Sequence, residues 1–187
     1  MTITRNGTAG NDRIRMKNVF PYSETIRVNG LAGHDELVGA FLHYNELFGG
    51  TGNDTLTGGA SGNLLDGGAG NDLMDAWQSS GYSTFRGGAG NDYIQGGDGG
   101  NLLDGGIGND TLAGGAGADA FIFAAGDGAD RISDFQDGVD RIVIESGAER
   151  FADLRITDLG ADTRISFSNV TVTLAKIDHA VLGAADF

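Results

Sequence analysis

A nine-residue repeat occupies residues 49–122 and limits the folds open to this chain more than any other feature. Each copy begins with two glycines and a variable residue, followed by a residue that is usually glycine. Aspartate or asparagine stands at place six and an apolar residue at place eight. Seven near-copies start at residues 49, 58, 67, 87, 96, 105 and 114. A fixed short period indicates a stack of similar units that pack mainly against their neighbours.

The repeat predicts a tight turn followed by a short strand. Glycine accepts a positive φ, and Asn and Asp favour turns, so the first six residues can form the turn. In the three-residue strand, the place-eight side chain points opposite to its neighbours and faces the interior. Two nonapeptides then make one flattened coil, and we expect an all-β, right-handed parallel roll with a thin core. The expected interior residues are Leu56, Leu65, Met74, Ile94, Leu103, Leu112 and Phe121.

Place six differs between the two edges of such a coil. Alternate repeats belong to opposite edges, and one edge then carries Asp12, Asp35, Asp54, Asp72, Asp92 and Asp110. The other edge carries Glu24, Asn45, Asn63, Ser83, Asn101 and Asp119. Calcium takes six to eight oxygen ligands, which inward carbonyls and Asp carboxylates can supply, so we predict a calcium ladder on the first edge. On the second edge we expect Asn side chains to bond the neighbouring backbone, although an Asn carbonyl can also ligate calcium.

The flanking segments are predicted to extend and close the roll. Residues 1–48 keep weaker copies of the turn at 7–15 and 30–38, and we expect degenerate N-terminal coils there. Asp130 and Asp140 continue the spacing of the two edges after the regular repeats end. Residues 154–178 alternate apolar and polar residues in three runs, which predicts an antiparallel meander. The predicted division is therefore 1–48, 49–122 for the regular roll, and 123–187 for the cap and terminal region.

The composition agrees with a metal-dependent protein. Twelve Lys and Arg against 26 Asp and Glu give a formal net charge of −14, which disfavours nucleic-acid binding. Bound calcium would offset this charge, so the acidic balance has an explanation. The chain has no Cys, which fits export without a disulfide-forming step. We find no run of 18 apolar residues and no N-terminal signal peptide, and we expect no transmembrane segment.

The nonapeptides, the run from ADAFIF to DRIVI (118–144) and the ending AADF (184–187) carry a family resemblance. The chain resembles the RTX (repeats-in-toxin) family, and in particular the C-terminal β-roll of serralysin-type proteases, related lipases and alginate epimerases. The resemblance implies a calcium-binding module that leaves a Gram-negative bacterium through type I secretion machinery and folds on Ca²⁺ outside the cell. The terminal Asp186 and Phe187 are similar to the uncleaved signal of that route.

The resemblance also implies a ligand set. Several Ca²⁺ ions would lie between stacked turns, each held by carbonyls of places two and four from one turn, by carbonyls of places one and three from the next, and by both place-six aspartates. The implied metal-site residues are Leu31, Gly33, Asp35, Gly49, Gly50, Thr51, Gly52, Asp54, Gly67, Gly68, Ala69, Gly70, Asp72, Gly87, Gly88, Ala89, Gly90, Asp92, Gly105, Gly106, Ile107, Gly108, Asp110, Asp127 and Asp130.

Insertions on the neutral edge carry aromatic residues that suggest an alternative function. Tyr44, Trp77 and Tyr82 can form a glycan or cell-surface contact, or they can pack as a small satellite core. The alternative is thus an extracellular interaction solenoid with structural calcium. Ice binding is disfavoured because the third places lack a regular Thr row. We expect no enzyme activity, since the chain has neither HExxH nor GxSxG and its three His are isolated in sequence.

Overall fold

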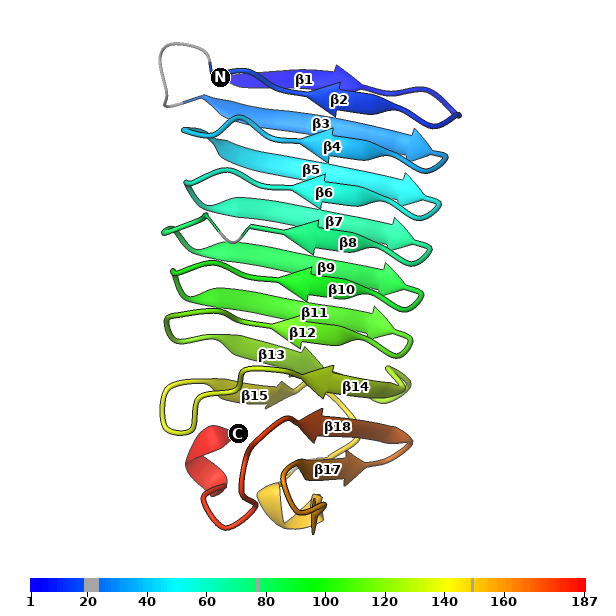
Figure 1. Cartoon of the computed structure of the whole chain (residues 1–187). Coiled ribbons are helices and arrows are strands. Elements are labelled where there is room, and N and C mark those ends of the chain that lie inside the picture. The colour runs from blue at the N-terminus through cyan, green and yellow to red at the C-terminus, as the bar shows by residue number, and fades with distance from the viewer. Residues whose placement is uncertain (19–23, 77, 149) are drawn as a thin grey trace.

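The computed structural model describes residues 1–18, 24–76, 78–148 and 150–187 and is an all-β solenoid. Successive strands alternate between two facing parallel sheets, and the coils stack in chain order from the N-terminal end (Figure 1). Three antiparallel strands follow near the C-terminus. The predicted all-β class, parallel roll and antiparallel C-terminal strands are confirmed. The three-part division at residues 48 and 122 stays a prediction.

The two sheets contain all the strands of the described residues. Sheet A runs in the order β1 (Thr2–Asn6), β3 (Thr25–Ala32), β5 (Tyr44–Thr51), β7 (Asn63–Ala69), β9 (Ser83–Ala89), β11 (Asn101–Ile107), β13 (Ala120–Phe123) and β15 (Arg141–Ile144). Sheet B runs in the order β16 (Arg155–Asp158), β17 (Thr163–Phe167), β18 (Val170–Leu174), β14 (Ala129–Ile132), β12 (Thr111–Ala113), β10 (Tyr93–Gln95), β8 (Leu73–Asp75), β6 (Thr55–Thr57), β4 (Glu36–Val38) and β2 (Arg13–Arg15). Two short 3-10 helices, η1 (Phe151–Asp153) and η2 (Ala184–Asp186), complete the fold.

Strand length differs between the sheets, which the repeat did not predict. Strand β8 has the expected three residues, whereas β7 has seven and continues through the next pair of glycines. These glycines pair in register from coil to coil, as Gly50 with Gly68 and Gly68 with Gly88. Glycine has no Cβ, so backbones can approach closely there and the ladder extends to the edge of the roll. Sheet A therefore leads directly into the aspartate-bearing turns.

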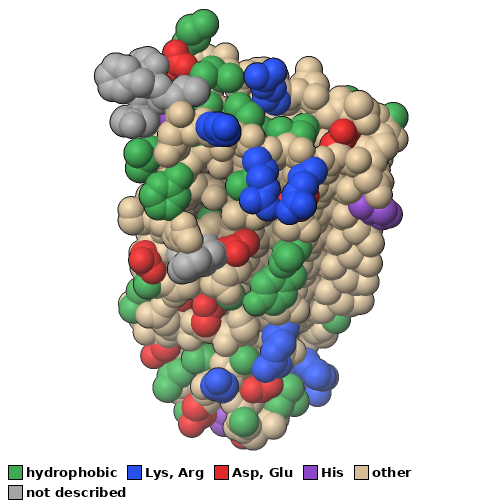
Figure 2. Space-filling view, turned by 45° about the horizontal axis from the view of Figure 1, so that its top comes forward, with side chains coloured by type: hydrophobic (Ala, Val, Ile, Leu, Met, Phe, Trp, Pro, Cys, Tyr) green, Lys and Arg blue, Asp and Glu red, His purple; other side chains and the backbone are tan. Residues whose placement is uncertain are grey.

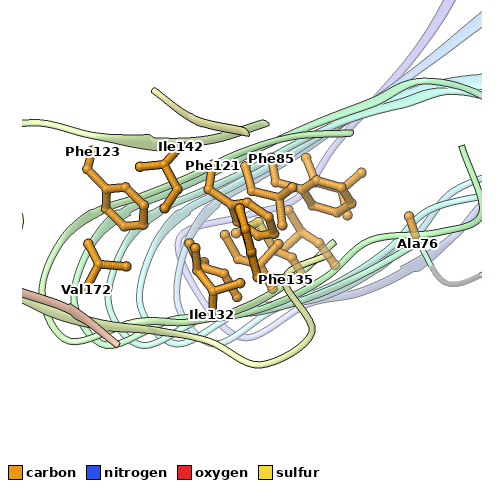
Figure 3. Close-up of a cluster of buried hydrophobic side chains, with 14 of the residues drawn as sticks. Ala76, Phe85, Phe121, Phe123, Ile132, Phe135, Ile142 and Val172 are labelled. Atoms are coloured by element: carbon orange, nitrogen blue, oxygen red, sulfur yellow. The ribbon is translucent and has the colours of Figure 1, made fainter. Parts of the chain in front are cut away.

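The core is a narrow file of apolar side chains between the sheets. All seven expected interior residues are fully buried, together with Ile26, Leu37, Leu47 and Phe85. Toward the C-terminus the core contains larger, aromatic side chains, where Phe121, Phe123 and Phe135 lie near Ile142 and Val172 (Figure 3). Because each coil adds only about two such side chains, truncating a buried Leu to Ala is expected to cost about 2–5 kcal/mol.

The C-terminal meander extends one sheet of the roll. Strand β18 pairs in parallel with β14, and β17 and β16 follow in antiparallel order, so sheet B continues beyond the last strand of sheet A. Its inward residues Ile165, Val170 and Leu174 join the core. The predicted meander is therefore confirmed. No helix among the described residues is long and apolar enough to span a bilayer.

Candidate metal sites along the aspartate edge

The turns that lead from sheet A to sheet B stack into one edge, which we call the aspartate edge. Its place-six residues are Asp12, Asp35, Asp54, Asp72, Asp92, Asp110 and Asp130. Each carboxylate from Asp35 onward accepts, through Oδ1, the backbone N–H of the aspartate one coil earlier. The N–H of Asp54 donates to Asp72 over 2.7 Å, and that of Asp72 to Asp92 over 2.8 Å. The ladder thus fixes one oxygen of every carboxylate.

From Asp35 onward, the second oxygen of each carboxylate has no hydrogen-bond partner among the described residues. Oδ2 is buried and makes no hydrogen bond within the described residues at Asp35, Asp54, Asp72, Asp92, Asp110 and Asp130. Buried polar atoms are normally paired, because an unpaired one costs about 1–3 kcal/mol and a charged one more. A file of such oxygens therefore requires either protons or cations.

Backbone carbonyls face the same gaps between coils. A Cβ built on Gly49 would lie within 3.0 Å of both Asp54 Oδ2 and the carbonyl oxygen of Gly67. A Cβ on Gly68 would meet the carbonyl oxygen of Gly50 in the coil before it. Each gap thus combines carboxylate and carbonyl oxygens where no side chain fits, and hard oxygen donors of this kind suit Ca²⁺.

The position equivalent to Gly68 is not glycine in every coil. Gly50, Gly68, Gly88 and Gly106 all have φ between +85° and +110°. Leu31 stands at the same place with φ +85°, and its carbonyl oxygen points at Gly50 as the glycine carbonyls point at theirs. The sequence prediction that Leu31 offers a carbonyl therefore agrees with this geometry, at the cost of a strained backbone.

Burial and mutual repulsion shift the acidity of the ladder. Burial raises the pKa of Asp72 to about 7, against the N–H of Asp54, which lowers it, and the charge of Asp92 raises it further. Burial likewise raises the pKa of Asp110 to about 7 and those of Asp92 and Asp130 to about 6. Without a counterion, this edge holds its negative charges unfavourably at neutral pH.

The structure brings most of the expected site residues together. Carbonyls and carboxylates of the predicted set line consecutive gaps from the coil of Asp35 to the coil of Asp130. Among the described residues no three His, Cys, Asp or Glu side chains gather at one point, because each gap contains two aspartates and otherwise backbone. That these atoms ligate calcium stays a prediction.

Two positions at the ends of the ladder depart from the regular pattern. The backbone carbonyl of Asp127 accepts the N–H of Gly108 over 2.6 Å, as the place-three carbonyls do in earlier coils, while its carboxylate accepts the N–H of Ala124. At the first coil, Asp12 Oδ2 accepts both the N–H and the hydroxyl of Thr8, at 2.6 and 2.9 Å. The first gap is thus closed by the chain itself.

The opposite edge, which we call the asparagine edge, is closed by side-chain donors. It holds the place-six residues Asn45, Asn63, Ser83, Asn101, Asp119 and Asp140. Asn63 Nδ2 donates to the carbonyls of Gly59 and Ser61 at 3.1 and 2.7 Å, the same two places whose carbonyls face the gaps of the aspartate edge. The amide of Gln136 donates to the Gly115 carbonyl over 2.9 Å. The expected bonding of Asn side chains to backbone is confirmed.

The end of the asparagine edge retains two unpaired oxygens. Asn101 Oδ1 and Asp119 Oδ2 are buried and lack a hydrogen-bond partner within the described part of the chain. Burial raises the pKa of Asp119 to about 6, and the charges of Asp140 and Asp134 add to this shift. An ion bound on this edge would therefore find unpaired oxygens in the coils around Asp119.

Sequence reasoning missed a second ladder on the aspartate edge. The Oδ1 atoms of Asn53, Asn71 and Asn91 accept the backbone N–H of the place-five residue one coil later, at 2.7–2.9 Å. His34 replaces an Asn in this row, and its Nδ1 accepts the N–H of Asn53 over 2.7 Å. The sequence signal for this row is the recurring Gly-Asn-Asp triplet at places four to six of the repeat. Its asparagine, at place five, received no predicted role.

The candidate aromatic surface is only partly described. Tyr44 and Tyr82 flank the asparagine edge and are 42% and 60% exposed, while Trp77 lies outside the described residues. Their role as a ligand surface stays a prediction.

Comparison with known proteins identifies the repeat. The family model of the RTX calcium-binding nonapeptide repeat (4 copies) matches residues 45–77 and 86–121. Among solved structures, the extracellular lipase LipA from Serratia marcescens is similar at a TM-score of 0.48 and 17% identity. The similarity covers 96% of this chain, which spans 38% of the lipase chain. A search of curated proteins found no match.

Proposed function

We propose that this chain, which carries RTX calcium-binding nonapeptide repeats, is a calcium-binding β-roll and a secreted module that folds on binding Ca²⁺ outside the cell. The observation that carries the proposal is the file of buried, unpartnered aspartate oxygens on the aspartate edge. Bound Ca²⁺ would supply the positive charge and the coordination that these oxygens and their neighbouring carbonyls lack.

Linkage explains how calcium can control folding. A ligand that binds only the folded state stabilises it by RT ln(1 + [L]/Kd) for each site, so several stacked sites give a steep response. At low calcium, repulsion among the acidic groups of a chain of net charge −14 favours the open state. The same repeat can therefore stay unfolded inside a cell and fold outside it.

The C-terminal end fits export before folding. RTX repeats are typical of secreted proteins of Gram-negative bacteria, and we propose the type I route for this chain. In the folded protein Asp186 is 4% exposed and its Oδ2 accepts the N–H of Gly183 over 2.8 Å, while the Phe187 ring packs 5.2 Å from that of Phe151. The Asp186 side chain is thus enclosed in the folded protein, so export machinery would reach it more readily in the unfolded chain.

We further propose that this chain carries no catalytic centre. A catalytic histidine needs an oriented partner and an accessible substrate. His34 lies in the asparagine row of the aspartate edge, His43 is fully buried, and His179 lies beside Asp158 and Asp178 at the surface. These separate positions support a folding and secretion module.

Circular dichroism during a calcium titration tests the proposal. Chelator-treated protein is expected to be largely disordered and to gain β structure cooperatively at millimolar or lower calcium, in the range of extracellular modules and sensors. Magnesium serves as the matched control, because its strict octahedral geometry and reluctance to dehydrate suit these backbone-rich gaps poorly. A β spectrum that persists in excess chelator would contradict the proposal.

A further inference from the structure

The outer face of sheet A carries charges of both signs in similar number, although the chain as a whole has a net charge of −14. Its outward positions form two rows along the stack of coils, because strands β5 to β15 pair in register. The first row reads Glu46, Leu64, Thr84, Leu102, Ala120 and Arg141. The second row reads Phe48, Asp66, Arg86, Asp104, Ile122 and Val143. Such a face can approach another copy of the same acidic chain without strong repulsion.

The charges at the centre of this face form no ion pair within one copy. Arg86 is exposed and lies between Asp66 and Asp104 on the neighbouring strands, yet it makes no ion pair with a carboxylate of the described residues. Burial raises the pKa of Asp104, the charges of two nearby carboxylates raise it further, and the charge of Arg86 lowers it. A further cation beside Asp104 would therefore be favourable, and Arg86 has donors left to offer.

The order of residues along the two rows is self-complementary. A two-fold axis parallel to the strands and midway between β9 and β11 reverses the order of coils in a second copy laid face to face on the first. This rotation places Arg86 opposite Asp104 of the second copy and, by symmetry, Asp104 opposite the second Arg86. It also places Glu46 opposite the second Arg141. Opposite charges therefore meet at the centre and at both ends of the overlap.

Apolar side chains meet between these charged pairs in the same arrangement. Leu64 comes to lie opposite Ala120 of the second copy, and Phe48 opposite the second Val143. Asp66 comes to lie opposite an isoleucine and keeps Arg86 of its own copy as its neighbour. Packed sheets cross at about 30°, and residues next to the axis are displaced least by this angle. The contact between Arg86 and Asp104 is therefore the best-defined pair of the arrangement.

The outer face of sheet B lacks this complementarity. Its arginines lie toward its two ends, with Arg13 and Arg15 on β2 and Arg131 on β14. Figure 2 shows basic side chains above and below a hydrophobic patch. A two-fold rotation would set one basic end upon the other, and like charges opposed in this way disfavour association. Sheet A is therefore the sheet that suits contact between two copies.

We propose that two copies of this chain associate through the outer faces of their A sheets, as a two-fold dimer in which Arg86 of each copy contacts Asp104 of the other. At about 4.8 Å per strand and roughly 20 Å of strand length, an overlap from β5 to β15 covers about 600 Å² on each copy. Specific interfaces bury about 800 Å² per partner, so we expect a weak dimer with a Kd in the micromolar range. This association goes beyond the calcium-dependent folding proposed above and leaves the aspartate edge free.

Sedimentation velocity over a range of protein concentrations at saturating calcium tests the interface by charge exchange. The parent protein should show a reversible equilibrium between monomer and dimer. Arg86→Glu and Asp104→Arg each bring like charges together at the axis and should weaken association at least about tenfold. An equimolar mixture of these two variants should dimerise as the parent does, because the two changed side chains then face each other and so do the two unchanged ones.

Asp66→Arg is the matched control for this exchange. It makes the same change of charge on the same face, on the strand at the other side of Arg86. Mixing it with Arg86→Glu should not restore the dimer, since Asp66 does not face Arg86 of the second copy. The double variant Arg86→Glu/Asp104→Arg exchanges both charges within one chain and should dimerise as the parent does.

Two outcomes would overturn the proposal. A parent protein that stays monomeric up to about 1 mM would show that the face does not associate. A dimer that is unchanged by the single variants, or that the mixture fails to restore, would show that Arg86 and Asp104 are not in contact. The calcium-dependent circular dichroism of each variant is recorded in parallel, so a failure of folding is distinguished from a failure of association.

Discussion

The two edges of the roll are built from the same repeat and differ in how they fill the space between coils. On the aspartate edge, carbonyl and carboxylate oxygens face one another, and from Asp35 onward the buried Oδ2 atoms have no hydrogen-bond partner within the described residues. On the asparagine edge, amide groups such as Asn63 Nδ2 donate to the corresponding carbonyls. On the asparagine edge, a side-chain amide thus provides the hydrogen-bond donor for these carbonyls. On the aspartate edge, a bound cation would have to coordinate the equivalent carbonyls instead.

The comparison also holds within one edge. At its first coil the aspartate edge is closed by Thr8, whose N–H and hydroxyl both reach Asp12. From Asp35 onward no such donor is present within the described residues, and the unpaired oxygens begin. We therefore expect calcium dependence to be set gap by gap, through the presence or absence of a local donor.

The largest expected effect comes from filling a gap of the aspartate edge. Gly68 has φ +102°, and a Cβ there would collide with the Gly50 carbonyl, so Gly68→Ala should lower the free energy of unfolding by more than about 3 kcal/mol. Urea unfolding at saturating calcium measures it. Gly160→Ala is the control, since Gly160 has φ +88° but nothing within 4 Å, and about 1–2 kcal/mol is expected.

Acidity should partly replace calcium on the aspartate edge. The folded-state pKa values of about 7 for Asp72 and Asp110 exceed the unfolded value of about 3.9, so the folded state binds more protons. Their contribution to stability is complete below about pH 4 and is lost as the pH rises through about 7. Calcium-free protein should therefore gain β structure between about pH 8 and pH 5, measured by circular dichroism.

By the same linkage, the calcium concentration needed for folding should decrease as the pH falls from about 8 to about 5, because protonation of these carboxylates already stabilises the folded state. A calcium midpoint for folding that increases over this pH range would contradict the assignment of the buried carboxylates. Asn63→Ala is a useful comparison protein here, because it leaves these aspartates unchanged.

The smallest expected effect is a stabilisation. Leu31 occupies a glycine place with φ +85° and is 52% exposed, so little burial is lost when it is replaced. Leu31→Gly should raise the free energy of unfolding by about 1 kcal/mol through relief of backbone strain. The control Leu73→Gly, also exposed but in a regular strand, should lower it. A loss of stability in Leu31→Gly would contradict the strain argument.

Much of the fold could be predicted because the repeat determines it locally. The place-eight residues from Leu56 to Phe121 became the core, and the alternation of Asp and Asn defined the two edges. The strand through the place-one and place-two glycines was missed, because propensity opposes glycine in strands and only the stacking of coils favours it.

Features that depend on contacts between coils were less accessible. The place-five asparagine row could not be read from one repeat, since each Oδ1 accepts the N–H of a residue 18 or 20 positions later in the chain. The pairing of Thr8 with Asp12 was likewise hidden, because Thr8 stands where glycine is usual. Three arginines of sheet B, Arg13, Arg15 and Arg131, stand at places seven and nine, which the repeat leaves variable.

The calcium dependence of paired variants on the two edges tests the account most directly. Calcium binding is followed by calorimetry for ion number and by circular dichroism for the folding midpoint, in Asp72→Asn and Asn63→Ala. Asp72→Asn should bind fewer ions and raise the midpoint by about tenfold or more, since Asp72 faces two gaps. Asn63→Ala should lose about 2–3 kcal/mol of stability at saturating calcium with its ion number unchanged. Equal shifts in midpoint and ion number would contradict the assignment of calcium to one edge.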